Sequence, residues 1–387
     1  MFENILGKKL ATQEGMVVSI EPLAEDIIFG IRSGDDLVVD TAKYVPQAFD
    51  QEFFDELGRI ISEKQQENPE VDMQKAAVIL PDQLFLMDMI SIPVIHRKAM
   101  QHSLSLAVEA IYNNAEEMNL MTYSVQQTKQ AATFGLVGAR RDLLENVRKV
   151  FTDKGITVTG ITYASNAMVN GAFDLNPKLK GETFLFMDIK EKYTRFAFVV
   201  RGVTMGYFDV PFGYGIISGR RVATEDMLFD HTSGELLVLN AKERARAKQL
   251  TMEGAITMEE REAILSGEGV DEDLLRKATR RRPKFMQRPI PETEVDCMYE
   301  NFRFIVKWAL ELINNNEEIV SLAKLDKVYV NIPREYRFLL ERANKNKEQN
   351  GVVFHPLLAD ARNTEITNNL ELHGAYFLGQ YNEANTF

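Results

Sequence analysis

The sequence predicts an α/β protein built from two halves of related topology, with a smaller unit inserted into the first half. Residues 184–212 have the pattern of three consecutive β-strands joined by two tight turns, and Asp188 closes the first strand. A similar pattern occurs near the N-terminus, where Glu21 ends an apolar run and Gly34 follows at nearly the spacing that separates Asp188 from Gly202. Helical and further strand patterns follow each copy. The chain therefore has the pattern of a duplication.

The first half begins with three strands and a helix. Apolar runs of strand length occur at 17–21, 27–31 and 37–40, and apolar residues recur at helical spacing over 49–64. A fourth strand is expected at 76–80. These elements predict a sheet that starts with a three-stranded meander and is covered by a helix.

An insertion is expected directly after this fourth strand. A strand at 84–92, a helix at 96–112 and a strand at 120–127 give a β-α-β pattern. The sheet of the first half is then expected to resume at 133–137.

The second half repeats the meander and continues with longer helical patterns. Its expected elements are helices at 214–230, 294–314, 334–344 and 370–381, a hairpin at 232–240, polar helices within 241–292, and strands at 327–331 and 352–355. The expected divisions are a leader at 1–14, a first domain at 15–83 and 129–180, an inserted subdomain at 84–128, and a second domain at 181–387 with a smaller lobe at 231–292.

Composition excludes several classes of function. At 387 residues and 45% hydrophobic the chain can bury two domain cores, and its net charge of −12 argues against a nucleic-acid binder. No apolar run reaches the roughly 18 residues that span a bilayer, and no secretory leader is present, so a cytoplasmic location is expected. The single cysteine, Cys297, forms no intramolecular disulfide. The histidines lack metal-ligand spacing and the serines lie in no nucleophile elbow, so no metal ligand and no catalytic residue is predicted.

The order of elements resembles the PilM family of type IV pilus assembly proteins, which are relatives of the FtsA division proteins. The segments AAVILPDQLFLMDMISIP and ATFGLVGARRDLLENVRKVFTDKGITVTGITYASNAM, together with the two meanders, carry the resemblance over nearly the whole chain. It implies the duplicated two-domain fold of the actin-like ATPase superfamily (ASKHA, ribonuclease H-like), with an inserted subdomain in the first half and a central nucleotide cleft.

The superfamily grips the phosphates of Mg-ATP with two hairpins that carry an Asp-x-Gly pattern. Glycine lets main-chain N–H groups approach the phosphates, and the carboxylate holds Mg²⁺. In this chain the first hairpin carries Glu21 and Leu23 at the matching positions. The second keeps Asp188 and Thr194 but places Lys190 where the pattern has glycine.

The third loop of the family, a Gly-Gly turn beside the adenosine, is Asn331-Ile332-Pro333 in this sequence. All three loops are therefore altered, and the resemblance implies a pseudo-ATPase that needs no cofactor. A functional Mg-ATP switch is the alternative, and Asp188 is also explained as an ordinary turn carboxylate. The vestigial nucleotide-binding residues implied by the resemblance are Glu21, Asp188, Lys190, Thr194 and Asn331.

The family resemblance also implies a partner. PilM relatives bind an extended cytoplasmic tail of the membrane protein PilN in a groove between the first domain and the insertion. The strand at 84–92 supplies Met87, Met89, Ile90 and Ile92 as adaptable apolar surface for such a tail, or alternatively as plain core.

The expected function is thus a cytoplasmic scaffold or adaptor of a type IV pilus or related envelope assembly, peripheral to the membrane through its partners. Pilus motor or platform components are further candidate partners, and self-association stays open. The alternative from another class is an FtsA-type division or cytoskeletal filament protein.

Overall fold

The computed structural model describes ten segments of the chain: 15–33, 36–44, 46, 48–69, 73–112, 115–220, 293–315, 325–345, 351–358 and 364–377. The expected leader at 1–14 and the smaller lobe at 231–292, with its hairpin and polar helices, lie outside these residues.

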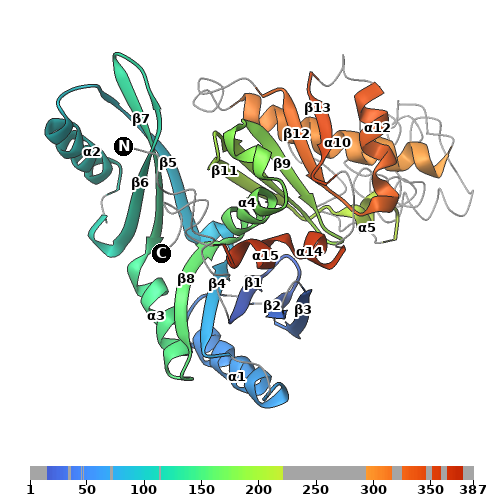
Figure 1. Cartoon of the computed structure of the whole chain (residues 1–387), viewed down its shortest axis with the longest axis horizontal. Coiled ribbons are helices and arrows are strands. Elements are labelled where there is room, and N and C mark those ends of the chain that lie inside the picture. The colour runs from blue at the N-terminus through green and yellow to red at the C-terminus, as the bar shows by residue number, and fades with distance from the viewer. Residues whose placement is uncertain are drawn as a thin grey trace, which may run out of the picture.

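Each half of the described chain contains a five-stranded sheet, and the two sheets have the same strand order (Figure 1). The first has the order β3-β2-β1-β4-β8 and consists of β1 (Met16–Glu21), β2 (Asp26–Ser33), β3 (Asp36–Lys43), β4 (Lys75–Leu80) and β8 (Thr157–Tyr163). The second has the order β11-β10-β9-β12-β13 and consists of β9 (Phe184–Ile189), β10 (Thr194–Val200), β11 (Val203–Val210), β12 (Lys327–Asn331) and β13 (Val353–Pro356).

The strand directions match as well. In each sheet the first three strands form an antiparallel meander, and the remaining two run parallel to the central strand. The predicted duplication is therefore confirmed, with Glu21 at the end of β1 and Asp188 near the end of the equivalent strand β9.

The inserted unit differs from the predicted β-α-β pattern. It contains β5 (Phe85–Pro93), α2 (Arg97–Ile111), β6 (Met118–Gln127) and β7 (Ala131–Arg140), in a three-stranded antiparallel sheet of order β5-β7-β6. The expectation that the first sheet resumes at 133–137 is wrong, because these residues belong to β7. A tight turn, in which Thr128 N–H donates to the Ala131 carbonyl (2.8 Å), folds β7 back onto β6. Strand β7 is the central strand of this sheet, and its residues 135–139 are buried. Burial on both faces explains why β7 has the apolar run of a core strand.

Helices cover both faces of the first sheet. On one face lie α1 (Gln51–Glu67), whose first turn is capped by Asp50, and α3 (Arg141–Thr152). On the other lie α4 (Ala164–Leu175) and α15 (Leu370–Ala375). Helix α4 also packs on the second sheet through Phe173 and its neighbours, so it forms a layer between the halves.

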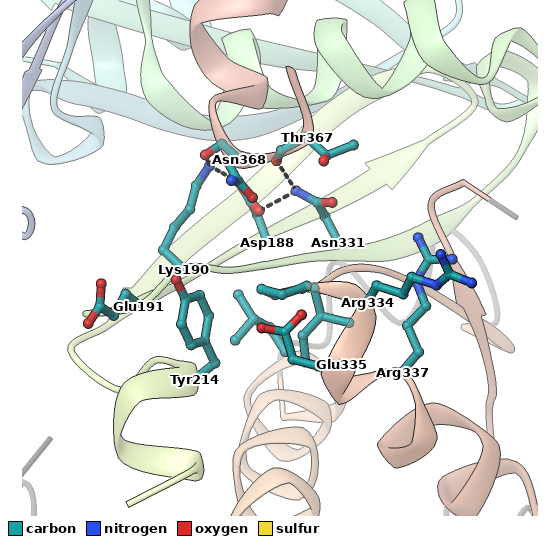
Figure 2. Close-up of a pocket in the computed structure, with 13 residues that line it drawn as sticks. Asp188, Lys190, Glu191, Tyr214, Asn331, Arg334, Glu335, Arg337, Thr367 and Asn368 are labelled. Carbon is teal, nitrogen blue, oxygen red and sulfur yellow. Dashed lines mark hydrogen bonds and ion pairs between the residues drawn. The ribbon is translucent and has the colours of Figure 1, made fainter. Parts of the chain in front are cut away.

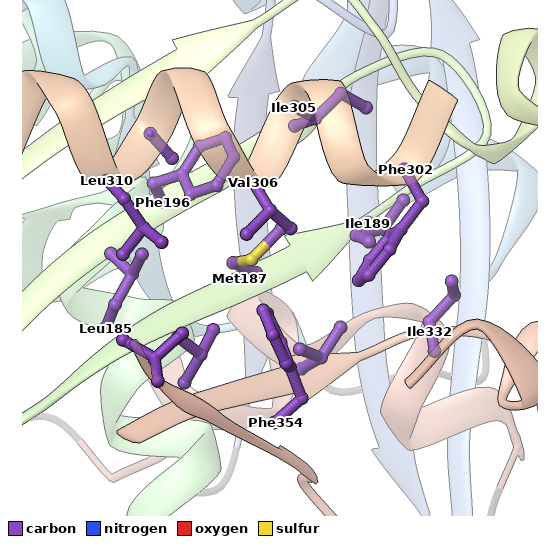
Figure 3. Packing of buried hydrophobic residues seen from close by; sticks show 14 of the residues in the cluster. Leu185, Met187, Ile189, Phe196, Phe302, Ile305, Val306, Leu310, Ile332 and Phe354 are labelled. Carbon is purple, nitrogen blue, oxygen red and sulfur yellow. The ribbon is translucent and has the colours of Figure 1, made fainter. Parts of the chain in front are cut away.

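The second sheet has its main core on the face away from α4. Here α10 (Glu294–Asn314) and α12 (Phe338–Lys345) pack on the inward side chains of β9 and β10, and Figure 3 shows Val306 of α10 beside Met187 and Phe302 beside Ile189. The helix expected at 214–230 is short: α5 (Tyr214–Ile217) ends at Ile217, and residues after Arg220 lie outside the described part.

The remaining elements are short. They are the 3₁₀ helices η1 (Asp82–Leu84), η2 (Ala115–Glu117), η3 (Pro177–Gly181) and η5 (Arg334–Tyr336), and the helix α14 (Thr364–Asn368). The helix expected at 334–344 is thus divided into η5 and α12, and the last one, expected at 370–381, ends as α15 at Ala375.

Helices α4 and α15 cross at two glycines. A Cβ atom on Gly374 would lie 1.8 Å from the carbonyl oxygen of Ala167, and one on Gly171 would lie 2.4 Å from that of Leu370. The backbones approach so closely that neither position accepts a larger side chain without movement. This contact holds the C-terminal helix on the first sheet, directly beside the cleft.

Among the helices that the structure describes, none combines the length and the hydrophobicity needed to cross a bilayer.

Candidate functional site

The two equivalent hairpins, β1–β2 and β9–β10, face each other across the cleft between the halves. Side chains from the β9–β10 turn reach the first hairpin. Lys192 Nζ lies 3.0 Å from Glu25 Oε2 and also donates to the carbonyl of Ala24, and the hydroxyl of Tyr193 donates to Glu21 Oε2 at 3.1 Å. The hairpins are therefore joined to each other by their own side chains.

Arg195 is the centre of a buried ion cluster in this cleft. Its guanidinium is 2% exposed and lies 2.7 Å from Glu21 Oε2, 3.0 Å from Asp209 Oδ1 and 3.2 Å from Asp82 Oδ2. Glu21 and Asp82 come from the first half, whereas Arg195 and Asp209 come from the second. The cluster therefore joins the halves through charge-assisted hydrogen bonds.

Burial controls the acidity of these carboxyl groups. It raises the pKa of Asp82 to about 7, with Asp209 adding to the rise and Arg195 opposing it. Burial likewise raises the pKa of Glu21 against the attraction of Arg195. Asp82 is also fixed in place by Ser165, whose N–H and Oγ–H donate to its two oxygens at 2.8 and 2.7 Å.

A second cluster surrounds Asp188, near the end of β9 (Figure 2). Lys190 Nζ lies 3.0 Å from Asp188 Oδ2 and 3.0 Å from Glu371 Oε2 of α15, and it donates to the Asn368 carbonyl. Asn331 Nδ2 donates to Asp188 Oδ1 at 2.8 Å and to the Thr367 carbonyl at 2.6 Å. Burial raises the pKa of Asp188, and the Lys190 ammonium opposes this.

Beside this cluster the second half has a cavity of about 470 Å³. Its lining includes Pro333 and also Lys190, Tyr214, Arg334 and Glu335. Figure 2 shows the last four around the end of β9. The cavity carries charges of both signs.

Two apolar grooves flank strand β5 of the insertion. The insertion groove, about 750 Å³, lies between the insertion and helix α3 of the first half, and its residues are Gln83, Leu84, Leu86, Ile111, Tyr112, Glu117, Met118, Arg140 and Leu143. The β5–β11 groove, about 630 Å³, lies between the insertion and the second half, and its residues are Phe85, Leu86, Met87, Asp88, Met89, Phe198, Met205, Gly206, Tyr207, Phe208, Leu312 and Ile313.

The apolar residues that the sequence suggested for a partner are divided by strand alternation. Met87 and Met89 are half-buried and line the β5–β11 groove. Ile90 and Ile92 are each 4% exposed and pack with Val108 in the core under α2. A partner can therefore touch Met87 and Met89 on the surface, whereas Ile90 and Ile92 belong to the insertion's own core.

No protein-family model matches the chain, and no curated protein matches it in sequence. Among solved structures, it is similar to a chain of a PilM–PilN type IV pilus biogenesis complex, at 14% identity and a TM-score of 0.52, over 94% of this chain and 99% of that one. A second similar structure is an actin-like ATPase fold protein of unknown function from Bacteroides thetaiotaomicron (8% identity, TM-score 0.36, 93% and 96% of the two chains). The chain has an actin-like fold.

A third similar structure is the cytoplasmic domain of EpsL, an inner membrane component of the type II secretion system of Vibrio cholerae (15% identity, TM-score 0.36, 58% and 79% of the two chains).

The residues that the family resemblance assigned to Mg-ATP are engaged with other groups of the chain itself. Glu21, at the end of β1, and Asp188, near the end of β9, are paired with Arg195 and Lys190. The N–H groups of the first turn are also engaged, because Leu23 N–H donates to Glu21 Oε1 (3.3 Å) and Ala24 N–H to the Glu21 carbonyl (3.1 Å). In this arrangement both carboxylates and the first turn are thus engaged with groups of the chain itself.

Of the nucleotide-site residues taken from the sequence, Asp188, Lys190 and Asn331 lie in one cluster. Glu21 lies in the neighbouring Arg195 cluster. Thr194 lies apart from both, since its hydroxyl donates to the Phe212 carbonyl at 2.7 Å.

Sequence reasoning missed Arg195, Asp82, Asp209 and Glu371. A signal existed for the first of these, because TRFAFVV places one arginine inside an otherwise apolar strand, and a buried charge requires a partner.

Proposed function

We propose that this protein is a cytoplasmic actin-like adaptor of a type IV pilus or related secretion assembly, and that it docks the cytoplasmic tail of a PilN-like membrane protein without hydrolysing ATP. The observation that carries the proposal is the pairing of the cleft's two key carboxylates with Arg195 and Lys190 of the same chain. The fold shared with a chain of a PilM–PilN type IV pilus biogenesis complex supports the choice of machine and partner.

The pairing argues against nucleotide chemistry because of its energetic cost. To admit Mg²⁺, Asp188 would have to give up Lys190, whose ammonium would then keep Glu371 and the Asn368 carbonyl as its partners. Breaking a buried ion pair from one side costs about 3–5 kcal/mol. Each hairpin would carry such a cost, so a nucleotide would have to supply most of its binding energy merely to enter.

The insertion groove supports the docking role. It lies between the first half and the insertion, and two of its aliphatic side chains are well exposed, Leu86 at 43% and Ile111 at 46%. An extended apolar tail would cover them and form main-chain hydrogen bonds with the unpaired edge of β5, which is an edge strand of its sheet. The β5–β11 groove, with Met87 and Met89, is the second candidate position for the tail.

A functional Mg-ATP switch is the alternative function. The cavity of about 470 Å³ beside Asp188 is the observation that favours it, since its size suits a small ligand. It requires Lys190 to leave Asp188.

A matched pair of variants tests the docking site. A fluorescein-labelled synthetic peptide of a PilN-like cytoplasmic tail is titrated with wild type, Ile111→Glu and Leu312→Glu while fluorescence anisotropy is recorded. Ile111 and Leu312 are similarly exposed aliphatic residues, 46% and 42%, in the two different grooves.

We expect micromolar binding by wild type and by Leu312→Glu. Ile111→Glu loses the burial of about half an isoleucine side chain under the peptide and instead buries a carboxylate. Together these effects should weaken the binding free energy by about 2 kcal/mol, or roughly 30-fold in affinity. The reverse pattern would move the site to the β5–β11 groove, and failure of wild type to bind any such tail would refute the proposed function.

A further inference from the structure

We propose that the β9–β10 hairpin is a cleft latch: Lys190 and Lys192 of its turn and Arg195 of β10 take the place of a bound nucleotide in holding the halves closed, and they tie that closure to the position of the insertion. In this proposal the latch regulates the insertion groove, where the proposed function places the partner's tail. It rests on the proposed function only where peptide binding is measured.

The first step of the argument is that all three cations cross the cleft. Arg195 contacts Glu21 and Asp82 of the first half, and Lys192 contacts Glu25 in the β1–β2 turn. Lys190 contacts Glu371, which lies on α15. Because α15 packs its apolar face on the first sheet, this contact also joins the second half to the first.

The second step is the charge balance at Arg195. Among the described residues, three carboxyl groups surround this one guanidinium, and Glu21, Asp82 and Arg195 are each almost fully buried. Buried carboxylates from opposite halves repel each other unless a cation lies between them. Closure of the halves therefore depends on Arg195.

The third step connects the latch to the insertion. Asp82 begins η1, the link between β4 and β5, and the next residues, Gln83 and Leu84, line the insertion groove. The Tyr207 hydroxyl of β11 donates to the carbonyls of Asp82 (2.5 Å) and Phe85 (2.8 Å).

The other side of the insertion is attached to the same strand. The hydroxyl of Tyr123, on β6, donates to the Thr204 carbonyl of β11 at 3.1 Å. Strand β11 and Arg195 thus contact the insertion and its link at two places: at Asp82 and Phe85, and at Tyr123 of β6. If the halves open, either the hydrogen bonds of Tyr207 and Tyr123 break, or Leu84 and Leu86 move relative to α3. A movement of Leu84 and Leu86 would change the shape of the insertion groove.

The test measures distances in the full-length protein. In a Cys297→Ser background, spin labels on Glu52→Cys (α1) and Lys307→Cys (α10) report the two halves, and labels on Glu52→Cys and Lys98→Cys (α2) report the insertion. The variants are Arg195→Met, Lys190→Met and Tyr207→Phe. The control is Arg342→Met, which removes an arginine whose partner, Asp296, lies in the same half. Circular dichroism verifies folding, and pulsed electron spin resonance gives the distance distributions.

We expect narrow distributions at both label pairs for wild type and Arg342→Met. Arg195→Met should broaden and lengthen both, Lys190→Met should broaden the pair that spans the halves, and Tyr207→Phe should broaden only the insertion pair. Arg195→Met should also weaken tail-peptide binding about tenfold.

Wild-type distributions in folded Arg195→Met would show that the ion cluster is only structural and would overturn the latch. If Arg195→Met fails to fold, unchanged distributions in Lys190→Met and Tyr207→Phe would overturn it equally. Absence of peptide binding by wild type would refute the proposed function alone, because the distances still test the latch.

Discussion

Removing Arg195 should destabilise the protein far more than removing a comparable arginine elsewhere, and the loss should depend on pH. Arg195→Met leaves Glu21, Asp82 and Asp209 without their shared cation, at side-chain exposures of 2%, 3% and 15%. Breaking a buried ion pair from one side costs about 3–5 kcal/mol. We expect a loss of this size in the free energy of unfolding at pH 8, where carboxyl groups in water are fully ionised.

At pH 5.5 Arg195→Met should lose less of its free energy of unfolding. Burial raises the pKa of Glu21 and Asp82, so these carboxyl groups can bind protons and then no longer repel each other. The matched control is Arg342→Met, whose guanidinium is 38% exposed. A partly exposed pair of this kind contributes about 0–1 kcal/mol. Urea denaturation at both pH values gives the free energies. A loss for Arg195→Met that is no larger than that of the control, or that does not change with pH, would refute the reasoning.

Three further predictions concern the pH response and the packing. Because the folded pKa of Asp82 is raised to about 7 from 3.8, the stability that its proton provides is complete below about pH 4 and is lost as pH rises to about 7. Asp82→Asn should remove this slope from urea denaturation curves recorded between these pH values. Gly374→Ala should lower the melting temperature by many degrees because its Cβ meets the Ala167 carbonyl, whereas Gly181→Ala, with nothing within 4 Å, should not. Phe302→Ala, in the fully buried core of the second half, should cost about 3–5 kcal/mol in urea denaturation, and a loss under 1 would contradict the packing described.

The sequence predicted the duplicated architecture because each half begins with the same local pattern. Period-two strands followed by an amphipathic helix are local signals, and the meanders around Glu21 and Asp188 occupy equivalent places in the two sheets. The assignment of β7 failed because apolar periodicity shows that a strand is buried but does not identify the sheet that buries it. Residues 133–137 were consistent with either sheet until the pairing with β5 and β6 was known.

The candidate site was predictable only in part. The sequence comparison of the loops assigned Asp188, Lys190 and Asn331 to one site. They lie together in the structure because they are at the ends of the neighbouring strands β9 and β12. The partners from distant segments were not predictable: Glu371 lies 181 positions from Lys190, and Arg195 lies 174 positions from Glu21. Contacts of that kind depend on how the halves pack, and periodicity carries no information about it.

The central claim is that the cleft is closed by the chain's own cations and not by a nucleotide. Calorimetric titration of millimolar ATP with Mg²⁺ into the wild-type protein, with and without the tail peptide, tests it most directly. We expect no ATP binding tighter than about millimolar, or −4 kcal/mol, and the same peptide affinity in both conditions. A low micromolar dissociation constant for Mg-ATP, about −8 kcal/mol, with ATP hydrolysis that is lost in Asp188→Ala, would contradict the account and establish the Mg-ATP switch in its place.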